Sequence, residues 1–353
     1  MNNKFYLLIL LILLLYLIIN FTSGNSYISN DSLSYFEIAE KLPYIETSLF
    51  PILYPLFLKI FNFIFNDYTI SYKFLSITLI LISYYIPYRY NFLWKQIWCI
   101  LSFSSFLNIY LYAWSEILLI PLILLFTIIN YKFLNEEISY NKFIISISVI
   151  MFLMTITKYN SLFFLFSMFL FSLISKKNRK AYFISSLIAF GFIAMYLLNN
   201  YFITNLITGQ RPIPSYDTSA FLKTSISNIF LSVNPFNTQI ISFLNTITSL
   251  LNGNWKIPYL ILGLSSLILI VITVAKAIKK EFTSLMIISA FCFLFLSLIS
   301  GVRTSINFLD SRLLLGFYLL FFLCFISVFQ NNSKVNKILY FCSITSLLIY
   351  IVN

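Results

Sequence analysis

The stretch "FYLLILLILLLYLIINF", Phe5 to Phe21, is apolar almost throughout and contains no charged residue. An α-helix needs about 20 such residues to cross the hydrocarbon core of a bilayer, and similar runs recur along the whole chain. A transmembrane β-barrel would instead show short segments of alternating hydrophobicity, and this stretch does not alternate. The sequence therefore predicts an all-α polytopic membrane protein.

Composition supports this class and excludes several functions. Of the 353 residues 60% are hydrophobic and only 10% are charged, which is too little polar surface for a soluble domain of this length. The net charge of +12 does not indicate nucleic-acid binding, because the basic residues lie in short segments between apolar runs, where they set topology. The chain has no histidine, so a histidine base, a histidine-bound zinc and a Ser-His-Asp triad are excluded. The four cysteines lie within apolar runs and are interpreted as small buried hydrophobic residues.

The apolar runs define the predicted organisation: a single integral membrane domain over 1–353 with about eleven transmembrane helices. Two long segments outside the spans, 22–67 and 201–256, are predicted to be outer loops. The predicted spans are 5–21, 68–87, 97–111, 115–133, 142–157, 160–175, 181–200, 257–275, 283–300, 313–329 and 338–352.

Charge sets the predicted orientation. Alternate connections between spans are basic, as in "SKKNRK" at 175–180, and basic loops stay in the cytoplasm. The first apolar run is longer than the core of a secretory signal, so we expect an uncleaved span with a cytoplasmic N-terminus. Most acidic residues fall at the opposite, outer ends of the spans. The sequence thus predicts a multi-pass protein of the cytoplasmic membrane whose site faces outward.

The first outer loop contains two predicted surface helices. In "ISNDSLSYFEIAEKL" (28–42) the apolar residues recur with helical spacing, which predicts a short helix lying on the membrane with Asp31 as its N-cap. In "SLFPILYPLFLKIFNFIF" (48–65) Pro51 and Pro55 interrupt a smooth span. We expect a second surface or re-entrant helix there.

Five stretches, in order, resemble the GT-C superfamily of membrane glycosyltransferases, which includes the protein O-mannosyltransferases and the lipid A aminoarabinose transferase. The first outer loop is similar in Asp31, Tyr35, Ala39 and the Tyr54-Pro55-Leu56 element. The others are a Ser115-Glu116 pair before a span, Lys158 at a hairpin, the segment 209–212, and Arg312 before a late span. The resemblance implies a GT-C-like fold, a polyprenyl-phosphate-sugar donor and a lipid, glycan or protein acceptor. A second acidic pair in the first outer loop and a large soluble C-terminal domain are missing, as in smaller monosaccharide transferases.

This chemistry needs a carboxylate to accept the proton of the acceptor hydroxyl and cations to stabilise the phosphate as it leaves. By resemblance Asp31 is the candidate base, and Glu116 is the second catalytic acid, which orients a cation or a sugar hydroxyl. The candidate phosphate- and donor-binding residues are Lys158, Arg211, Arg303, Arg312 and Lys59, and the candidate substrate-binding residues are Tyr35, Glu37 and Tyr54.

Simpler interpretations stand beside these roles. Asp31 could only cap its helix, Glu116 could lie in headgroup water, Glu37 could be solvated, and Arg312 could pair with Asp310 or extend to the interface. The use of Mg²⁺ or Mn²⁺ stays open, because carboxylates bind such ions but the sequence shows no dedicated ligand set. A lipid-linked glycan polymerase or a flippase or transporter of the same envelope pathway is the alternative function, although the sequence shows no clear internal repeat of the transporter type.

Overall fold

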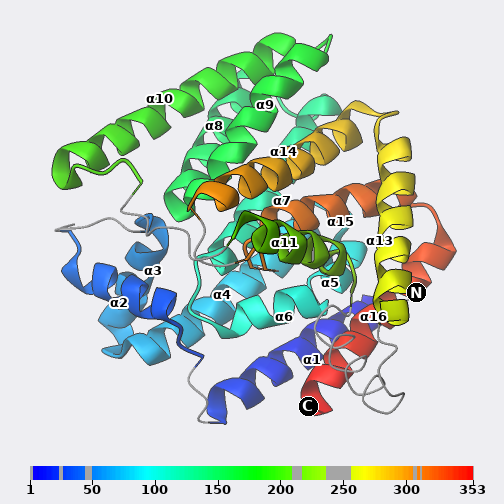
Figure 1. Ribbon diagram of the computed structural model, residues 1–353, viewed down its shortest axis with the longest axis horizontal. Helices are drawn as coiled ribbons and strands as arrows, with labels where there is room; N and C mark the ends of the chain where they lie inside the picture. The colour runs from blue at the N-terminus through cyan, green and yellow to red at the C-terminus, as the bar shows by residue number, and fades with distance from the viewer. Residues whose placement is uncertain are drawn as a thin grey trace.

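The computed structural model describes residues 3–23, 27–43, 50–208, 217–235, 256–304, 308–310 and 312–352. These residues form helices and no strands, which confirms the all-α prediction (Figure 1). The helices are α1 (Asn3–Thr22), α2 (Asn30–Lys41), α3 (Leu53–Phe65), α4 (Tyr68–Arg89), α5 (Trp94–Ile100), α6 (Ser104–Leu111), α7 (Glu116–Leu134), α8 (Tyr140–Thr157), the 3₁₀ turn η1 (Tyr159–Ser161), α9 (Leu162–Ile174), α10 (Arg179–Thr204), α11 (Thr218–Ser232), α13 (Lys256–Ala277), α14 (Glu281–Thr304), α15 (Leu315–Phe329) and α16 (Ser333–Val352).

Among the described residues, seven helices are long and apolar enough to cross a membrane: α1, α4, α7, α8, α10, α14 and α16. Shorter apolar stretches occur in α3, α13 and α15 and over Tyr159–Ile174. Large apolar side chains such as Leu11, Phe190 and Met195 point outward from α1 and α10. Exposure on this scale is unfavourable in water but normal against lipid tails. The protein is therefore a helical membrane protein.

One predicted span is wrong as a single helix. The segment 97–111 is divided between α5, which ends at Ile100, and α6, which begins at Ser104. The break is stabilised by neighbouring segments, because the Ser104 N–H donates to the Pro235 carbonyl at 3.1 Å and the Ser102 and Tyr84 hydroxyls lie 2.8 Å apart. Non-helical backbone is tolerated at membrane depth where protein satisfies its polar groups. Seven of the other predicted spans fall on the seven candidate membrane helices, 257–275 and 313–329 fall on the shorter apolar stretches of α13 and α15, and 160–175 covers η1 and α9.

The bundle is built around α7 and α15, whose residues are mostly buried. α7 packs against α4 and α8, α14 packs against α9 and α15, and α10 covers α8 and α9. Figure 1 shows α10 along one edge of the molecule and the α2–α3 pair at another. Because α7 and α15 both lie inside, the residues that directly precede them, Ser115 and Leu314, are buried as well.

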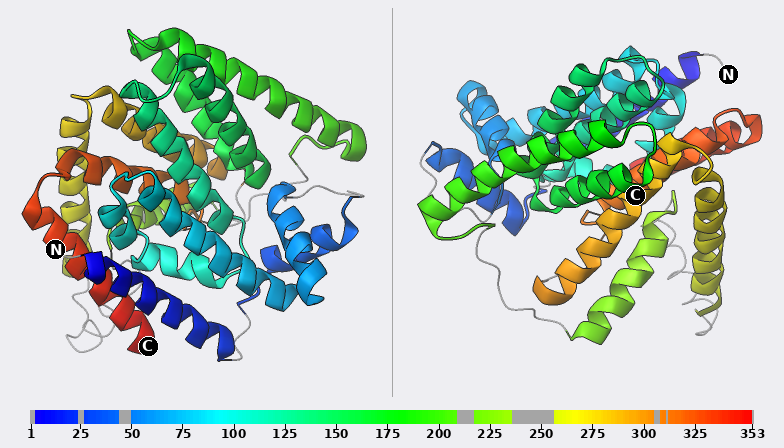
Figure 2. Two further views of the ribbon diagram at one scale, coloured as in Figure 1. Left: turned by 180° about the vertical axis from the view of Figure 1, so that it is seen from behind. Right: turned by 90° about the horizontal axis from the view of Figure 1, so that it is seen from above.

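The first and last helices, α1 and α16, lie side by side (Figure 2). The ring of Phe5 meets that of Tyr340 with centroids 6.0 Å apart, and Tyr16 meets Tyr350 at 5.8 Å. Because residue numbers rise together along both helices, α1 and α16 run parallel.

The segment 22–67 contains α2 and α3, which pack against each other. α3 is amphipathic: it buries Tyr54 and Leu58 but leaves Phe63 89% exposed, as expected for a helix that lies against lipid. In the segment 201–256 the described helix is α11, which packs on α13 and α14.

Candidate functional site

Four charged side chains meet at one end of the bundle, although they are far apart in sequence. Arg312 pairs through Nη1 with Asp31 Oδ2, across 281 positions of the chain, and its Nε lies 3.6 Å from Glu116 Oε1. Lys158 Nζ contacts the same Glu116 oxygen. We call these four residues the charged cluster. The structure thus brings together both predicted catalytic acids and two of the predicted cations.

Each member of the charged cluster lies where a helix begins or ends. Asp31 is in the first turn of α2, Glu116 opens α7, Lys158 directly follows α8, and Arg312 lies in the turn before α15. Both carboxylates are therefore at helix N-termini, where the helix dipole stabilises negative charge. The helix ends hold the backbone of all four residues and so restrict where their charged groups can lie.

Burial differs within the cluster. The side chain of Glu116 is 3% exposed, that of Arg312 12% and that of Lys158 15%, whereas Asp31 is 34% exposed. A buried carboxylate is tolerated only with close partners, and Glu116 has two cations. Burial alone would lower the pKa of Arg312, but the charges of Glu116 and Asp31 raise it above its usual range, so the guanidinium stays charged. Asp31 is the member that an incoming molecule can reach.

Asp31 is not the N-cap of α2, contrary to the simpler interpretation of the sequence. Ser29 takes that position: its hydroxyl accepts from the Ser32 N–H at 3.3 Å, and the Ser29 N–H donates to the Ser32 hydroxyl at 3.1 Å. This reciprocal pair is a capping box. It leaves the Asp31 carboxylate available for Arg312.

The second simple interpretation, a pair between Arg312 and Asp310, also differs from the structure. Asp310 accepts from the Leu313 N–H at 2.9 Å and so supports the turn that carries Arg312. Among the described residues, the carboxylates within ion-pair distance of Arg312 are those of Asp31 and Glu116.

The sequence did not single out Trp114, which contacts two parts of the site. Its ring lies under the Arg312 guanidinium, 4.7 Å from ring centroid to Cζ, and its indole N–H donates to the Ser29 hydroxyl at 2.8 Å. The ring of Tyr112 stacks on Trp114 with centroids 4.2 Å apart. Trp114 therefore links the cap of α2 to the orientation of Arg312. Its position two residues before Glu116 was the available signal.

The predicted substrate-binding tyrosines lie inside the protein. The Tyr35 hydroxyl is 2.8 Å from that of Ser115, which in turn lies 3.4 Å from Glu116 Oε2. Burial raises the pKa of Tyr35, with Glu116 adding to the effect, so the phenol stays neutral. Tyr54 is fully buried beside it, with ring centroids 5.1 Å apart. Tyr35 thus contacts Glu116 of the charged cluster indirectly, through the Ser115 hydroxyl.

The remaining candidates lie elsewhere or outside the described residues. Glu37 is exposed and pairs with Lys41 at 2.9 Å. The Lys59 ammonium donates to the Leu42 carbonyl at the end of α2, a favourable position for a cation. Arg303 is exposed in the last turn of α14, and Arg211 lies outside the described residues.

The charged cluster does not fit a divalent cation well. The carboxylates of Asp31 and Glu116 already contact the positive charges of Arg312 and Lys158, which would repel a metal ion. No group of three His, Cys, Asp or Glu side chains with metal-binding geometry occurs in the described part of the chain. Lys158 and Arg312 already provide the positive charge that Mg²⁺ or Mn²⁺ would otherwise bring to these carboxylates.

No protein-family model, curated protein or solved structure matches this chain.

Proposed function

We propose that the protein is a GT-C-type glycosyltransferase, which moves a sugar from a polyprenyl-phosphate carrier to an acceptor hydroxyl. The observation that supports this proposal is the meeting of Asp31, Glu116, Lys158 and Arg312. The two carboxylates and two cations come from four distant segments. They provide a proton acceptor and a pair of positive charges that can bind a phosphate. The proposal includes about eleven membrane crossings, with the cluster at the outer face of the cytoplasmic membrane.

In the proposed reaction the acceptor oxygen attacks the anomeric carbon of the sugar. The bond from that carbon to the phosphate oxygen breaks, and the lipid phosphate leaves with the electron pair. The hydroxyl proton passes to the Asp31 carboxylate, which is the most exposed member of the cluster. Arg312 and Lys158 stabilise the charge that grows on the phosphate.

The ion pair between Asp31 and Arg312 fits an ordered sequence of events. An arriving phosphate competes with Asp31 for the guanidinium, because both are anions that an arginine fork binds well. Its binding releases the Asp31 carboxylate to accept a proton. Glu116 stays between Lys158 and Arg312 and holds both cations in place. In this scheme the donor phosphate activates the base.

The test is sugar transfer from labelled polyprenyl-phosphate carriers in membranes that contain wild-type protein or Asp31→Asn. The asparagine keeps the size of the side chain and leaves the Ser29 cap intact, so we expect normal expression and a rate about 10²–10⁴-fold lower. Arg312→Ala should weaken donor binding. Glu40→Gln, which neutralises an exposed carboxylate of the same helix, is the matched control and should retain full activity. Full turnover by well-expressed Asp31→Asn would contradict the assignment of the base.

A second candidate is a flippase or transporter of the same lipids. The observation that favours it is that the ion pairs connect the ends of α2, α7, α8 and α15, as a gate between moving helices would. This candidate predicts movement of the lipid carrier across the membrane without a glycosylated product. A glycan polymerase would instead give products of increasing length in the same assay.

A further inference from the structure

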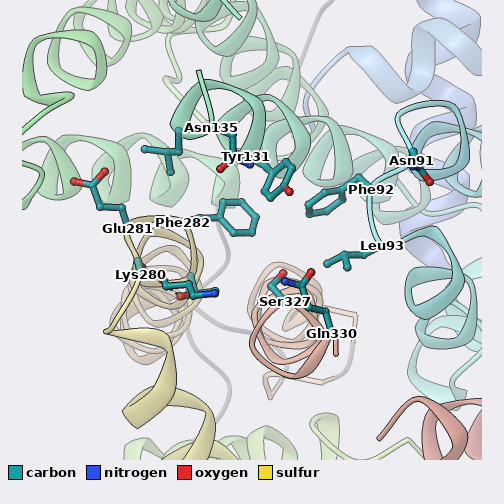
Figure 3. Close-up of a pocket in the computed structure, with 12 residues that line it drawn as sticks. Asn91, Phe92, Leu93, Tyr131, Asn135, Lys280, Glu281, Phe282, Ser327 and Gln330 are labelled. Carbon is teal, nitrogen blue, oxygen red and sulfur yellow. Dashed lines mark hydrogen bonds between the residues drawn. The ribbon is translucent and has the colours of Figure 1, made fainter. Parts of the chain in front are cut away.

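A cavity of about 390 Å³ lies among helix ends other than those that carry the charged cluster. It is bounded by the connection between α4 and α5, the end of α7, the start of α14 and the end of α15 (Figure 3). This volume falls within the range of about 300–1,000 Å³ that is usual for small-ligand sites. Because these are the ends of apolar helices, a bilayer that these helices cross would have its headgroups at the level of the cavity.

The polar wall of the cavity is rich in hydrogen-bond donors. The amides of Asn91, Asn135 and Gln330 and the ammonium of Lys280 all line it. Within the described part of the chain, none of these four side chains has a hydrogen-bond partner or a carboxylate in ion-pair range. Amides and an ammonium together offer up to nine N–H bonds. All four side chains are exposed to solvent, so water satisfies their donors, and a ligand that displaces this water must offer several acceptor oxygens in its place.

The charge of the cavity favours an anion. Figure 3 shows the Lys280 side chain extending into the space beside Ser327 and Gln330. Glu281 also lines the cavity, but its side chain points away from Lys280 (Figure 3), and its carboxylate accepts from the Ser175 hydroxyl at 3.3 Å. The nearby Lys132 pairs with Glu137 at 3.7 Å. Glu281 therefore does not neutralise the positive charge of Lys280 in the cavity.

Aromatic rings lie across the cavity from Lys280 and Gln330 (Figure 3). The rings of Phe92, Tyr131 and Phe282 pack against one another with centroid separations of 4.9, 5.2 and 6.0 Å. They give the ligand an apolar boundary beside the polar one. The neighbouring Leu93 has a φ of 43°, in the left-handed region that is unfavourable for any residue with a Cβ atom. The chain accepts this strain at a residue that lines the cavity.

We infer that this cavity binds the phosphate of an anionic lipid headgroup, with Lys280 as its charged contact and the amide of Gln330 as a hydrogen-bond donor. A phosphate offers the acceptor oxygens, and the glycerol and first acyl carbons match the aromatic wall. Basic pockets between transmembrane helices bind such headgroups in this way. The inference is independent of the proposed transferase activity, because it uses none of the residues of the charged cluster.

The experiment measures lipid retention by native mass spectrometry of the full-length protein, with short-chain phosphatidylglycerol and phosphatidylcholine as probes. We expect the wild-type protein to retain phosphatidylglycerol in preference and Lys280→Gln to weaken that binding about tenfold. Lys279→Gln removes the same charge one residue away, outside the cavity lining, and should have a smaller effect that salt abolishes. Gln330→Leu, which changes no charge, should also weaken retention.

Three results would overturn the inference. Equal losses in Lys279→Gln and Lys280→Gln would indicate only a general surface attraction. Equal retention of the two lipids by the wild-type protein would exclude recognition of an anionic headgroup. Binding of inorganic phosphate that depends on Lys280, without retention of phosphatidylglycerol, would assign the cavity to a soluble phosphate instead.

Discussion

Replacement of Glu116 by glutamine tests the physics of the charged cluster without any assumption about its function. Glu116→Gln keeps the volume of the side chain but removes its negative charge. The cluster then contains two cations and only one carboxylate. Removing one partner of a buried ion pair typically costs about 3–5 kcal/mol of folding free energy, because a buried charge is left uncompensated. Asp31 still contacts Arg312, so we expect a loss near the lower limit, about 3 kcal/mol.

The assay is unfolding of the purified protein in mixed micelles, monitored by loss of helical signal. Glu136→Gln is the matched control: Glu136 also pairs with a lysine, Lys177, but both side chains are about 70% exposed to solvent (72% and 70%). Exposed pairs contribute little, so this variant should unfold like the wild-type protein. The double variant Glu116→Gln/Lys158→Met, which also removes a cation, should recover much of the loss. Identical midpoints for Glu116→Gln and Glu136→Gln would refute the view that Glu116 is a buried counter-ion.

Two further predictions concern the support of the cluster and the topology. Tyr35→Phe removes a buried hydroxyl that lies 2.8 Å from that of Ser115, so it should lower the free energy of unfolding by about 1 kcal/mol. Tyr85→Phe, at an exposed position, is the control and should have no effect. A Tyr35→Phe protein as stable as wild type would show that this hydrogen bond contributes nothing to stability. If the basic loops are cytoplasmic, a membrane-impermeant thiol reagent should label Leu33→Cys and spare Lys176→Cys in intact cells, in a background without the four native cysteines. Labelling of Lys176→Cys alone would reverse the predicted orientation.

The sequence predicted the helical class because long apolar runs have no other stable form in a bilayer. It also selected the four residues of the charged cluster. Ionisable side chains at the ends of apolar helices are costly unless they find partners, so Asp31, Glu116, Lys158 and Arg312 stood out in a chain with only 11 acidic residues.

What the sequence could not predict depends on contacts between distant segments. The break between α5 and α6 is stabilised by the Pro235 carbonyl, a contact that the sequence of 97–111 alone does not reveal. Serine and aspartate are both good N-cap residues, so the sequence did not show that Ser29, and not Asp31, caps α2. Trp114 is part of the site because Arg312, about 200 residues later, lies over its ring. The amphipathic pattern of α2 likewise did not reveal that the Tyr35 hydroxyl hydrogen-bonds to that of Ser115.

The parallel packing of α1 and α16 has a practical consequence for fusion proteins. Both helices are candidate membrane spans, and the contacts Phe5–Tyr340 and Tyr16–Tyr350 place their starting ends together. If both helices cross the bilayer, a polypeptide attached before α1 and one attached after α16 emerge in different compartments. A split reporter whose halves are joined to these two ends could not reassemble across one molecule, since about 30 Å of bilayer would separate them.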